Sequence, residues 1–194
     1  DAAAIPEVGI TAHDALVTQG GLTSGGWALV HAGGSGVGSM AVQVVRAMGA
    51  RVVTTASTGK VDAVKALGAD VVVDHTSEDF VEVVADVLDV VGGDYLPRNL
   101  RALRTGGTIV QVGVMGGGST TVDLASMLPK RAKLVGTVLR ARPLEEKVDA
   151  TRRFVAQVVP AIEAGTISPV IDRRFALADI AEAHRYMESN ANVG

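Results

Sequence analysis

The stretch His31-Ala32-Gly33-Gly34-Ser35-Gly36-Val37-Gly38 decides the fold of this 194-residue chain. It follows the apolar run Trp27–His31, which is typical of a buried strand, and it opens an apolar stripe of helical spacing that ends at Gly49. Small residues at such a junction let the backbone approach a diphosphate closely. The unpaired amides and the dipole of the helix N-terminus favour the negative charge of that group. The order of strand, glycine loop and helix therefore predicts a dinucleotide site.

The loop fits the dinucleotide pattern G-x-G-x-x-G imperfectly. Gly33 and Gly38 occupy the first and last glycine positions, and Ser35 stands in the middle one. Two rival motifs fail on single positions. A nucleophile elbow around Ser35 would need glycine in place of Val37, and a P-loop would need Ser or Thr after Gly59-Lys60, where the chain has valine. A glycine-rich turn that binds nothing is the remaining alternative.

The rest of the chain alternates short valine-rich runs with stretches of helical periodicity, as in a parallel α/β sheet. The runs are apolar throughout, as strands buried on both faces should be. The expected strands are Trp27–His31, Arg51–Thr55, Val71–Asp74, Val87–Val91, Thr108–Val112 and Lys133–Gly136. The expected helices include Val61–Leu67, Phe80–Val84, a stripe through Leu96 and Leu103, and a long stripe from Leu144 to Ile162 that Pro160 divides. The sequence thus predicts a Rossmann-type, doubly wound α/β sheet of six parallel strands.

The junction between the fourth strand and the helix before it is short. Only Ala85-Asp86 separates the helical stretch Phe80–Val84 from the strand Val87–Val91. A crossover of this kind needs at least about 10–12 residues in all. We expect either a true deletion or a missing stretch of chain between Val84 and Val87.

The C-terminal part carries a different pattern. Pro169–Phe175 is a candidate strand, and Leu177–Ser189 is an amphipathic helix. His184 lies on its apolar stripe with Ile180 and Met187, so we expect this histidine to pack in a core or an interface rather than to catalyse.

Composition excludes several function classes. The net charge is −3 with both signs mixed, and aromatic residues make up 3% of the chain, so nucleic acid is not an expected partner. Cysteine is absent, which rules out disulfides and thiolate metal sites and is compatible with the cytoplasm. The stretch Ala15–Val45 has no formal charge, but its eight glycines break it, so we expect no membrane span. The chain begins at Asp1 rather than Met, which suggests a fragment.

The end of the second strand indicates which dinucleotide binds. An NAD site usually places an acid there to hold the ribose hydroxyls. Here Thr54–Lys60 reads TTASTGK, with hydroxyls and one ammonium that could bind a 2′-phosphate and no acid to repel it. NADP(H) is the predicted cofactor. The alternative is that Lys60 is merely a solvated surface charge.

Several stretches together carry a family resemblance: His31–Gly38, Thr54–Lys60, Leu67-Gly68-Ala69-Asp70, Val90-Val91-Gly92-Gly93, Gly106–Gly113 and Leu139–Lys147. In this order they resemble the zinc-independent, zeta-crystallin-like quinone oxidoreductase branch of the medium-chain dehydrogenase/reductases. The similarity covers nearly the whole chain. It implies that residues 1–165 form the NADP(H)-binding domain. Residues 166–194 would then be a C-terminal strand and helix of a catalytic domain whose N-terminal barrel is absent.

The resemblance also implies roles for individual residues. The glycine loop would face the pyrophosphate, the end of the second strand the 2′-phosphate, and the fourth and fifth strand ends the nicotinamide. The expected cofactor-binding residues are Thr11, Ser35, Gly36, Val37, Gly38, Thr55, Ser57, Lys60, His75, Val90, Val112, Gly113 and Val114. Glu7 stands where zinc-dependent relatives carry a cysteine ligand, so no metal is expected. No residue of this chain is assigned as catalytic.

The implied activity is transfer of hydride from NADPH to a quinone or enone, with the chemistry residing in the cofactor. Two alternatives stay open: reduction of an enoyl or alkenal substrate, including as a piece of a larger synthase, and a structural or sensing protein that binds NADPH without turnover. The fragment alone should bind cofactor and turn over little. Thr120–Leu124 and Lys133–Gly136 resemble the region through which family members pair, so we expect a homodimer.

Four other side chains need an interpretation, and three of them have two. His31 ends a strand and should order the glycine loop, whereas His13 either approaches the cofactor or is structural. Arg140 and Arg142 either contact substrate or cofactor, or lie on a solvated surface.

Overall fold

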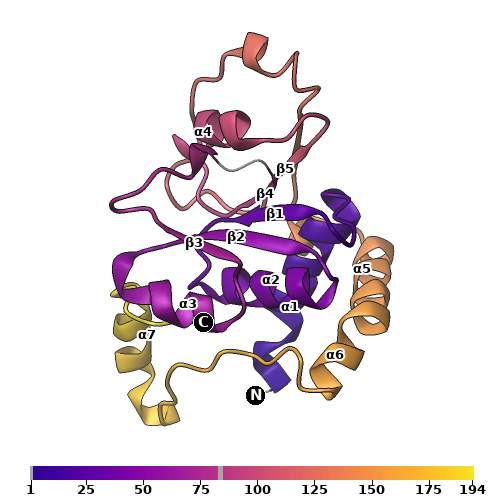
Figure 1. The fold of residues 1–194 in the computed structure, drawn as a ribbon. Helices are drawn as coiled ribbons and strands as arrows, with labels where there is room; N and C mark the ends of the chain where they lie inside the picture. Colours follow the sequence, from indigo (N-terminus) through magenta and orange to yellow (C-terminus); the bar gives the residue numbers. More distant parts are fainter. Residues whose placement is uncertain (1, 83–84) are drawn as a thin grey trace.

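The computed structural model describes residues 2–82 and 85–194 and contains one parallel sheet (Figure 1). Its strands are β1 (Trp27–Val30), β2 (Arg51–Ala56), β3 (Val71–Asp74), β4 (Asp86–Asp89), β5 (Thr108–Gln111) and β6 (Lys133–Gly136). They lie in the order β3-β2-β1-β4-β5-β6, and every neighbouring pair is parallel. This order reverses at β1, where a doubly wound sheet binds its ligand beyond the carboxyl ends of the strands. The predicted fold class is confirmed.

Seven α-helices and a π-helical turn accompany the sheet in the described part of the chain. They are α1 (Pro6–His13), the π-helical continuation Asp14–Gln19, α2 (Gly36–Ala47), α3 (Val61–Ala66), α4 (Tyr95–Ala102), α5 (Leu144–Gln157), α6 (Val159–Glu163) and α7 (Ile180–Glu188). Pro160 lies in the first turn of α6, so the predicted division of the long stripe is confirmed. None of the helices placed by the structure is long and apolar enough to cross a membrane.

Two apolar cores lie on opposite faces of the sheet because successive strand residues point to opposite sides. On β1, Ala28 and Val30 belong to the core that also holds the buried faces of α1, α2 and α5. Leu29, between them, belongs to the other core, which contains Phe80 and Leu100. Both faces of the central strands are therefore buried, which is why the sequence shows continuous apolar runs rather than alternation.

The C-terminal segment departs from the prediction. Pro169–Phe175 has no regular secondary structure, and none of its residues pairs with a strand among the described residues, although a strand requires such backbone pairing. The segment is tied to the domain at its start, where the amide of Ser168 donates to Oε1 of Gln43 over 2.9 Å and Nε2 of Gln43 donates to the Ser168 carbonyl over 3.0 Å. The C-terminal strand predicted here is wrong.

Helix α7 presents its apolar stripe to solvent. Ile180 and Met187 are 52% and 60% exposed, and His184 is exposed with them. Packing of His184 in a core is therefore wrong for this chain, and an interface stays a prediction. Val84, where the short junction begins, lies outside the described residues, as does the end of the expected helix Phe80–Val84. Ala85 is described and Asp86 begins β4, so the expected deletion or missing stretch stays a prediction. The described part of that helix is a single 3-10 turn, Phe80–Glu82.

Candidate functional site

The glycine loop presents two unpaired amides at the start of α2. Ser35 caps the helix: its Oγ accepts from the Gly38 amide over 3.1 Å and donates to the Ala32 carbonyl over 2.8 Å. The amide of Ser35 also donates to Ala32, over 2.9 Å. Within residues 2–82 and 85–194, the amides of Gly36 and Val37 have no acceptor. The expected unpaired amides are therefore those of Gly36 and Val37, whereas the Ser35 amide is bonded to the Ala32 carbonyl and the Gly38 amide to Oγ of Ser35.

Close contacts explain why glycine is needed at positions 33 and 38. A Cβ at Gly33 would overlap the side chain of Thr54 on β2, and one at Gly38 would overlap the carbonyl of Ala32. The chain therefore passes between strand and helix with no room for a methyl group. Ala32 itself has a φ of +54°, in the left-handed region, so the loop holds a non-glycine residue in a strained conformation.

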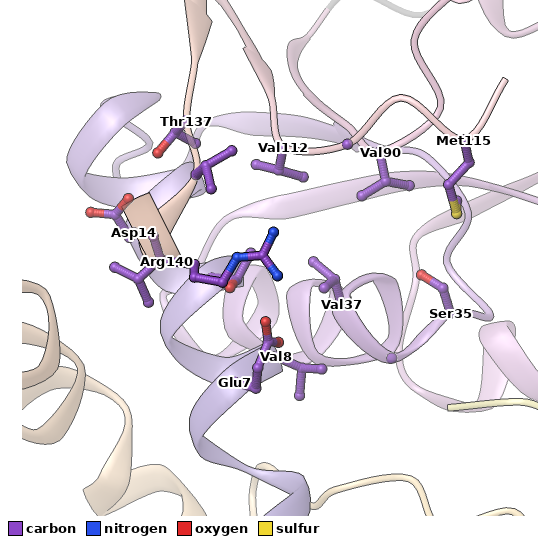
Figure 2. A pocket seen from close by; sticks show the side chains of 15 residues that line it. Glu7, Val8, Asp14, Ser35, Val37, Val90, Val112, Met115, Thr137 and Arg140 are labelled. Atoms are coloured by element: carbon purple, nitrogen blue, oxygen red, sulfur yellow. The ribbon is translucent and has the colours of Figure 1, made fainter. Parts of the chain in front are cut away.

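A cavity of about 510 Å³ opens at these amides (Figure 2). The residues around it are Glu7, Val8, Thr11, Asp14, Ser35, Gly36, Val37, Val90, Val112, Gly113, Met115, Thr137, Val138, Leu139 and Arg140. Seven of the expected cofactor-binding residues, from Thr11 to Gly113, are in this set. Val37, Val90 and Val112 supply an apolar wall between α2 and the ends of β4 and β5. One cavity thus combines free amides suited to an anion with an apolar surface suited to a flat ring.

The two arginines of the 139–142 stretch have different places. Figure 2 shows the side chain of Arg140 reaching into the cavity, near Glu7. Arg142 instead forms a bidentate ion pair with Asp14, over 2.5 and 3.1 Å, and also donates to the Thr137 hydroxyl. The carboxylate of Asp14 raises the pKa of Arg142, chiefly through these hydrogen bonds. Arg140 is thus placed to touch a ligand, whereas Arg142 is a structural residue.

The residues expected at a 2′-phosphate lie outside the cavity, beyond the ends of β2 and β3. Ser57 and Lys60 follow β2, and His75 follows β3, where its amide donates to the Ala56 carbonyl over 3.1 Å. The ammonium of Lys60 donates to Oδ1 of Asn190 over 3.0 Å. Partial burial lowers the pKa of Lys60, while the charge of Asp172 opposes that effect. The three residues share one end of the sheet.

The C-terminal segment also contacts the glycine loop itself. The amide of Gly194 donates to the Gly34 carbonyl over 3.0 Å, and Nδ2 of Asn192 donates to the Gly194 carbonyl over 2.8 Å. The stem of Lys60 packs beside Gly34. Residues from distant parts of the described sequence therefore meet at the loop.

Asp74 is an acid that our interpretation of the sequence missed. It ends β3, paired in register with Ala56 at the end of β2. Hydrogen bonds from the hydroxyls of Thr58 and Thr76 lower its pKa. The sequence signal was present, because parallel strands of similar length bring their carboxyl ends together. An acid therefore stands near the phosphate region, although it follows the neighbouring strand.

Thr55 and Val114 also lie outside this cavity. Thr55 is 1% exposed, and its hydroxyl contacts Nδ1 of His31 and accepts from the Ala32 amide, both over 3.1 Å. That hydroxyl is thus engaged inside the protein, and the expected contact between Thr55 and the cofactor stays a prediction. Val114 is 56% exposed and lies at a second, smaller hollow beside Gly117 and Leu134, and its expected contact with the nicotinamide stays a prediction.

The two buried histidines have structural surroundings. His13 lies against α5: its Nε2 is 2.8 Å from Oε1 of Gln157, and its ring packs edge-on against Phe154. His13 is not among the residues that line the cavity, which favours the structural interpretation of its role. His31 is fully buried beneath the glycine loop and contacts Thr55 and Asn99, as expected for a residue that orders the loop.

Comparison with known families settles the relationship. A family model described as zinc-binding dehydrogenase matches residues 67–194, well over half of the chain. The chain belongs to this family. The resemblance inferred from the sequence is thereby confirmed.

Individual relatives cover the same region. The chain is 35% identical to the polyketide synthase GfsB of Streptomyces halstedii over 100% of this chain and 3% of that protein. It is 31% identical to 2-methylene-furan-3-one reductase of Solanum lycopersicum, over 100% of this chain and 45% of that protein. The quinone oxidoreductase of Thermus thermophilus, whose structure is also known in complex with NADPH, superposes with a TM-score of 0.86. That structure is 26% identical, over 100% of this chain and 64% of the other. The chain thus spans less than half of the two curated relatives.

The residues present do not fit the zinc ion in the family's name. The sequence has no cysteine. Among the residues that the structure places, no group of three or more His, Asp or Glu side chains is arranged to hold a metal ion. Protein zinc sites need three or four such ligands in close tetrahedral geometry.

Proposed function

We propose that this chain is the NADP(H)-binding domain of a reductase that delivers hydride to an electrophilic carbon or quinone. The observation that carries the proposal is the pair of free amides at Gly36 and Val37, which open onto a cavity with an apolar valine wall. A diphosphate would accept from those amides, and the flat nicotinamide would lie against Val90 and Val112. The bound cofactor supplies the hydride.

The chain's own residues would orient the cofactor and exclude water. Glycine at positions 33 and 38 lets the backbone come close, and the Ser35 cap fixes the first turn of α2. Arg140 and Thr11 lie at the same cavity, where they could contact the cofactor or the acceptor. The ionisable side chains among the described residues of the cavity are Glu7, Asp14 and Arg140. Delivery of hydride to an acceptor that is already electrophilic requires none of them as an acid or base.

A quinone or enone is the proposed acceptor, and an enoyl thioester is the second candidate because a polyketide synthase is among the relatives. NADPH oxidation by the protein, assayed against quinones, enones and enoyl thioesters, distinguishes them. Turnover with one class alone would identify the acceptor. NADPH binding without any turnover by the protein that contains the whole catalytic domain would favour a structural or sensing role.

We expect Lys60→Ala to weaken NADPH binding about 10- to 100-fold, because the ammonium would lose its charge-assisted hydrogen bonds to the 2′-phosphate. NADH has no 2′-phosphate, so its binding should stay nearly unchanged. Fluorescence titration of both reduced cofactors measures the effect. Lys65→Ala is the matched control, since Lys65 is an exposed lysine on the neighbouring helix α3. Equal affinity for NADH and NADPH in the unaltered protein would contradict the cofactor preference.

The proposed homodimer pairs the exposed edge of the sheet. β6 is an edge strand, and Leu134 on it is 48% exposed, with Leu124 and Leu128 exposed nearby. We expect sedimentation to show a dimer, and Leu134→Lys to convert it to a monomer because a buried lysine at a strand pair is costly. Leu177→Lys, at an exposed leucine far along the chain, should leave the dimer intact. A monomeric unaltered protein at high concentration would count against pairing.

We further propose that residues 166–194 belong to a catalytic domain and that the protein acts in the cytoplasm. The exposed apolar positions of α7, Ile180 and Met187, support the first proposal because such a stripe is normally covered. A chain without cysteine needs no oxidising compartment, which supports the second.

A further inference from the structure

A chain of buried hydrogen bonds runs beneath the glycine loop. His31 is its centre: Nε2 lies 2.7 Å from Oδ1 of Asn99, and Nδ1 lies 3.1 Å from the hydroxyl of Thr55. All three side chains are buried. The rings of Phe80 and Tyr95 pack edge-on against the imidazole, with centroids 4.6 and 4.8 Å away, and leave water little access to it. The ring therefore depends on these two partners for its hydrogen bonds.

The direction of each hydrogen bond in this series follows from the end at Asp89. Nδ2 of Asn99 donates to Oδ2 of Asp89 over 2.9 Å, which fixes the amide and leaves Oδ1 as an acceptor toward His31. Nε2 of His31 must then carry the hydrogen. Nδ1 is the acceptor, so the Thr55 hydroxyl donates to it, while the same oxygen accepts from the Ala32 amide over 3.1 Å. One tautomer alone satisfies every group.

Each end of this series of hydrogen bonds fixes a backbone segment that lines the cavity. Oδ1 of Asp89 accepts from the amides of Val91 and Gly92, over 2.6 and 3.0 Å, and so fixes the turn after Val90. At the other end, Ala32 is the strained residue whose carbonyl accepts from Ser35, the cap of α2. The hydrogen bonds thus join the apolar wall to the anion-binding amides.

We propose that neutral His31, with its hydrogen on Nε2, is a positioning residue that sets the glycine loop against the turn after β4. The inference rests on the proposed NADP(H) function, because its purpose is to hold two cofactor-binding segments in one geometry. His31 touches no cofactor itself. It acts through Thr55 and Ala32 on one side and through Asn99 and Asp89 on the other.

The electrostatic surroundings keep the ring neutral. Burial lowers the pKa of His31 from 6.5 to about 4; the charge of Asp89 and the Asn99 hydrogen bond oppose this, and Arg98 and His75 add to it. Because the folded pKa lies below the unfolded one, the unfolded chain takes up the proton first. The stability that His31 contributes is therefore complete above about pH 6.5 and is lost as the pH falls toward 4.

Nuclear magnetic resonance of the ring nitrogens tests the assignment without any cofactor. At pH 7 we expect His31 to show hydrogen on Nε2 and a bare Nδ1, and the same neutral form should persist at pH 5. Hydrogen on Nδ1, or a charged ring at pH 6, would overturn the proposal. Failure of the protein to bind NADPH would refute the proposed function and leave this measurement untouched.

Three variants test the positioning role in cofactor titrations. His31→Phe and Thr55→Val both cut the chain of bonds, so each should raise the Kd for NADPH about 10-fold, as loss of a buried hydrogen bond does. His31→Gln keeps one donor and one acceptor and should recover most of the affinity. If His31→Phe does not fold, Thr55→Val decides, since it changes little volume. Unchanged affinity in Thr55→Val, or equal losses in His31→Gln and His31→Phe, would overturn the proposal.

Discussion

Gly38→Ala should destroy NADPH binding and lower the free energy of unfolding by about 3 kcal/mol, at the upper end for overpacking in a site that cannot relax. The added methyl would overlap the Ala32 carbonyl and the Cα of Gly33, which are backbone atoms and cannot rotate away. Helix α2 would have to move off the loop, and the Ser35 cap on the Gly38 amide would open with it. The amides of Gly36 and Val37 would then no longer point together at the cavity.

Gly118→Ala is the matched control. A Cβ at Gly118 meets no atom within 4 Å, so this variant should keep both the stability and the affinity of the unaltered protein. Urea unfolding and fluorescence titration of both variants measure the two effects. A Gly38→Ala protein that binds NADPH normally would show that the loop is not the phosphate site.

Asp14→Ala should lower the free energy of unfolding by about 3–5 kcal/mol, because it leaves the charge of Arg142 buried without its partner. The two side chains are only 5% and 14% exposed. Their bidentate pair joins the π-helical turn after α1 to the stretch that follows β6. Both segments border the cavity, so the loss should also weaken cofactor binding.

The exposed pair of Asp149 and Arg153 provides the comparison. These side chains are 59% and 51% exposed at 2.9 Å on one face of α5, so Asp149→Ala should change the stability by about 0.5 kcal/mol or less. Chemical unfolding of both variants measures the difference. Adding Arg142→Met to Asp14→Ala should recover part of the lost stability, since the unpaired charge is removed. Equal effects of the two aspartate variants would mean that the buried pair is hydrated.

The sequence was a good guide wherever one residue pattern dictates one backbone. Strands buried on both faces need continuous apolar residues, so β1, β2 and β5 could be placed within one or two positions. The glycine loop was equally predictable, because Gly33 and Gly38 lie where no Cβ fits. The family resemblance, rather than the residue pattern, implied Thr11, Val90 and Val112 as cofactor contacts, and all three line one cavity.

The errors concern what side chains do once the backbone is placed. Nothing in the local sequence shows that Ser35 occupies the Gly38 amide, or that the Thr55 hydroxyl turns inward to His31. Asp74 was missed because only the end of β2 was considered, although β3, the next strand, pairs with β2 in register and brings Asp74 beside Ala56. Pro169–Phe175 has the composition of a strand, but a strand exists only with a neighbour.

In the proposed site, the 2′-phosphate of NADPH would compete with Asn190 for the ammonium of Lys60. The ammonium already has an oxygen partner 130 positions away, so a phosphoryl group that recruits it must displace or share that partner. A preference for NADPH over NADH would then be the difference between the proposed contact of Lys60 with the 2′-phosphate and its contact with Asn190. Asn190, which would not contact the nucleotide itself, would therefore affect the discrimination between NADPH and NADH.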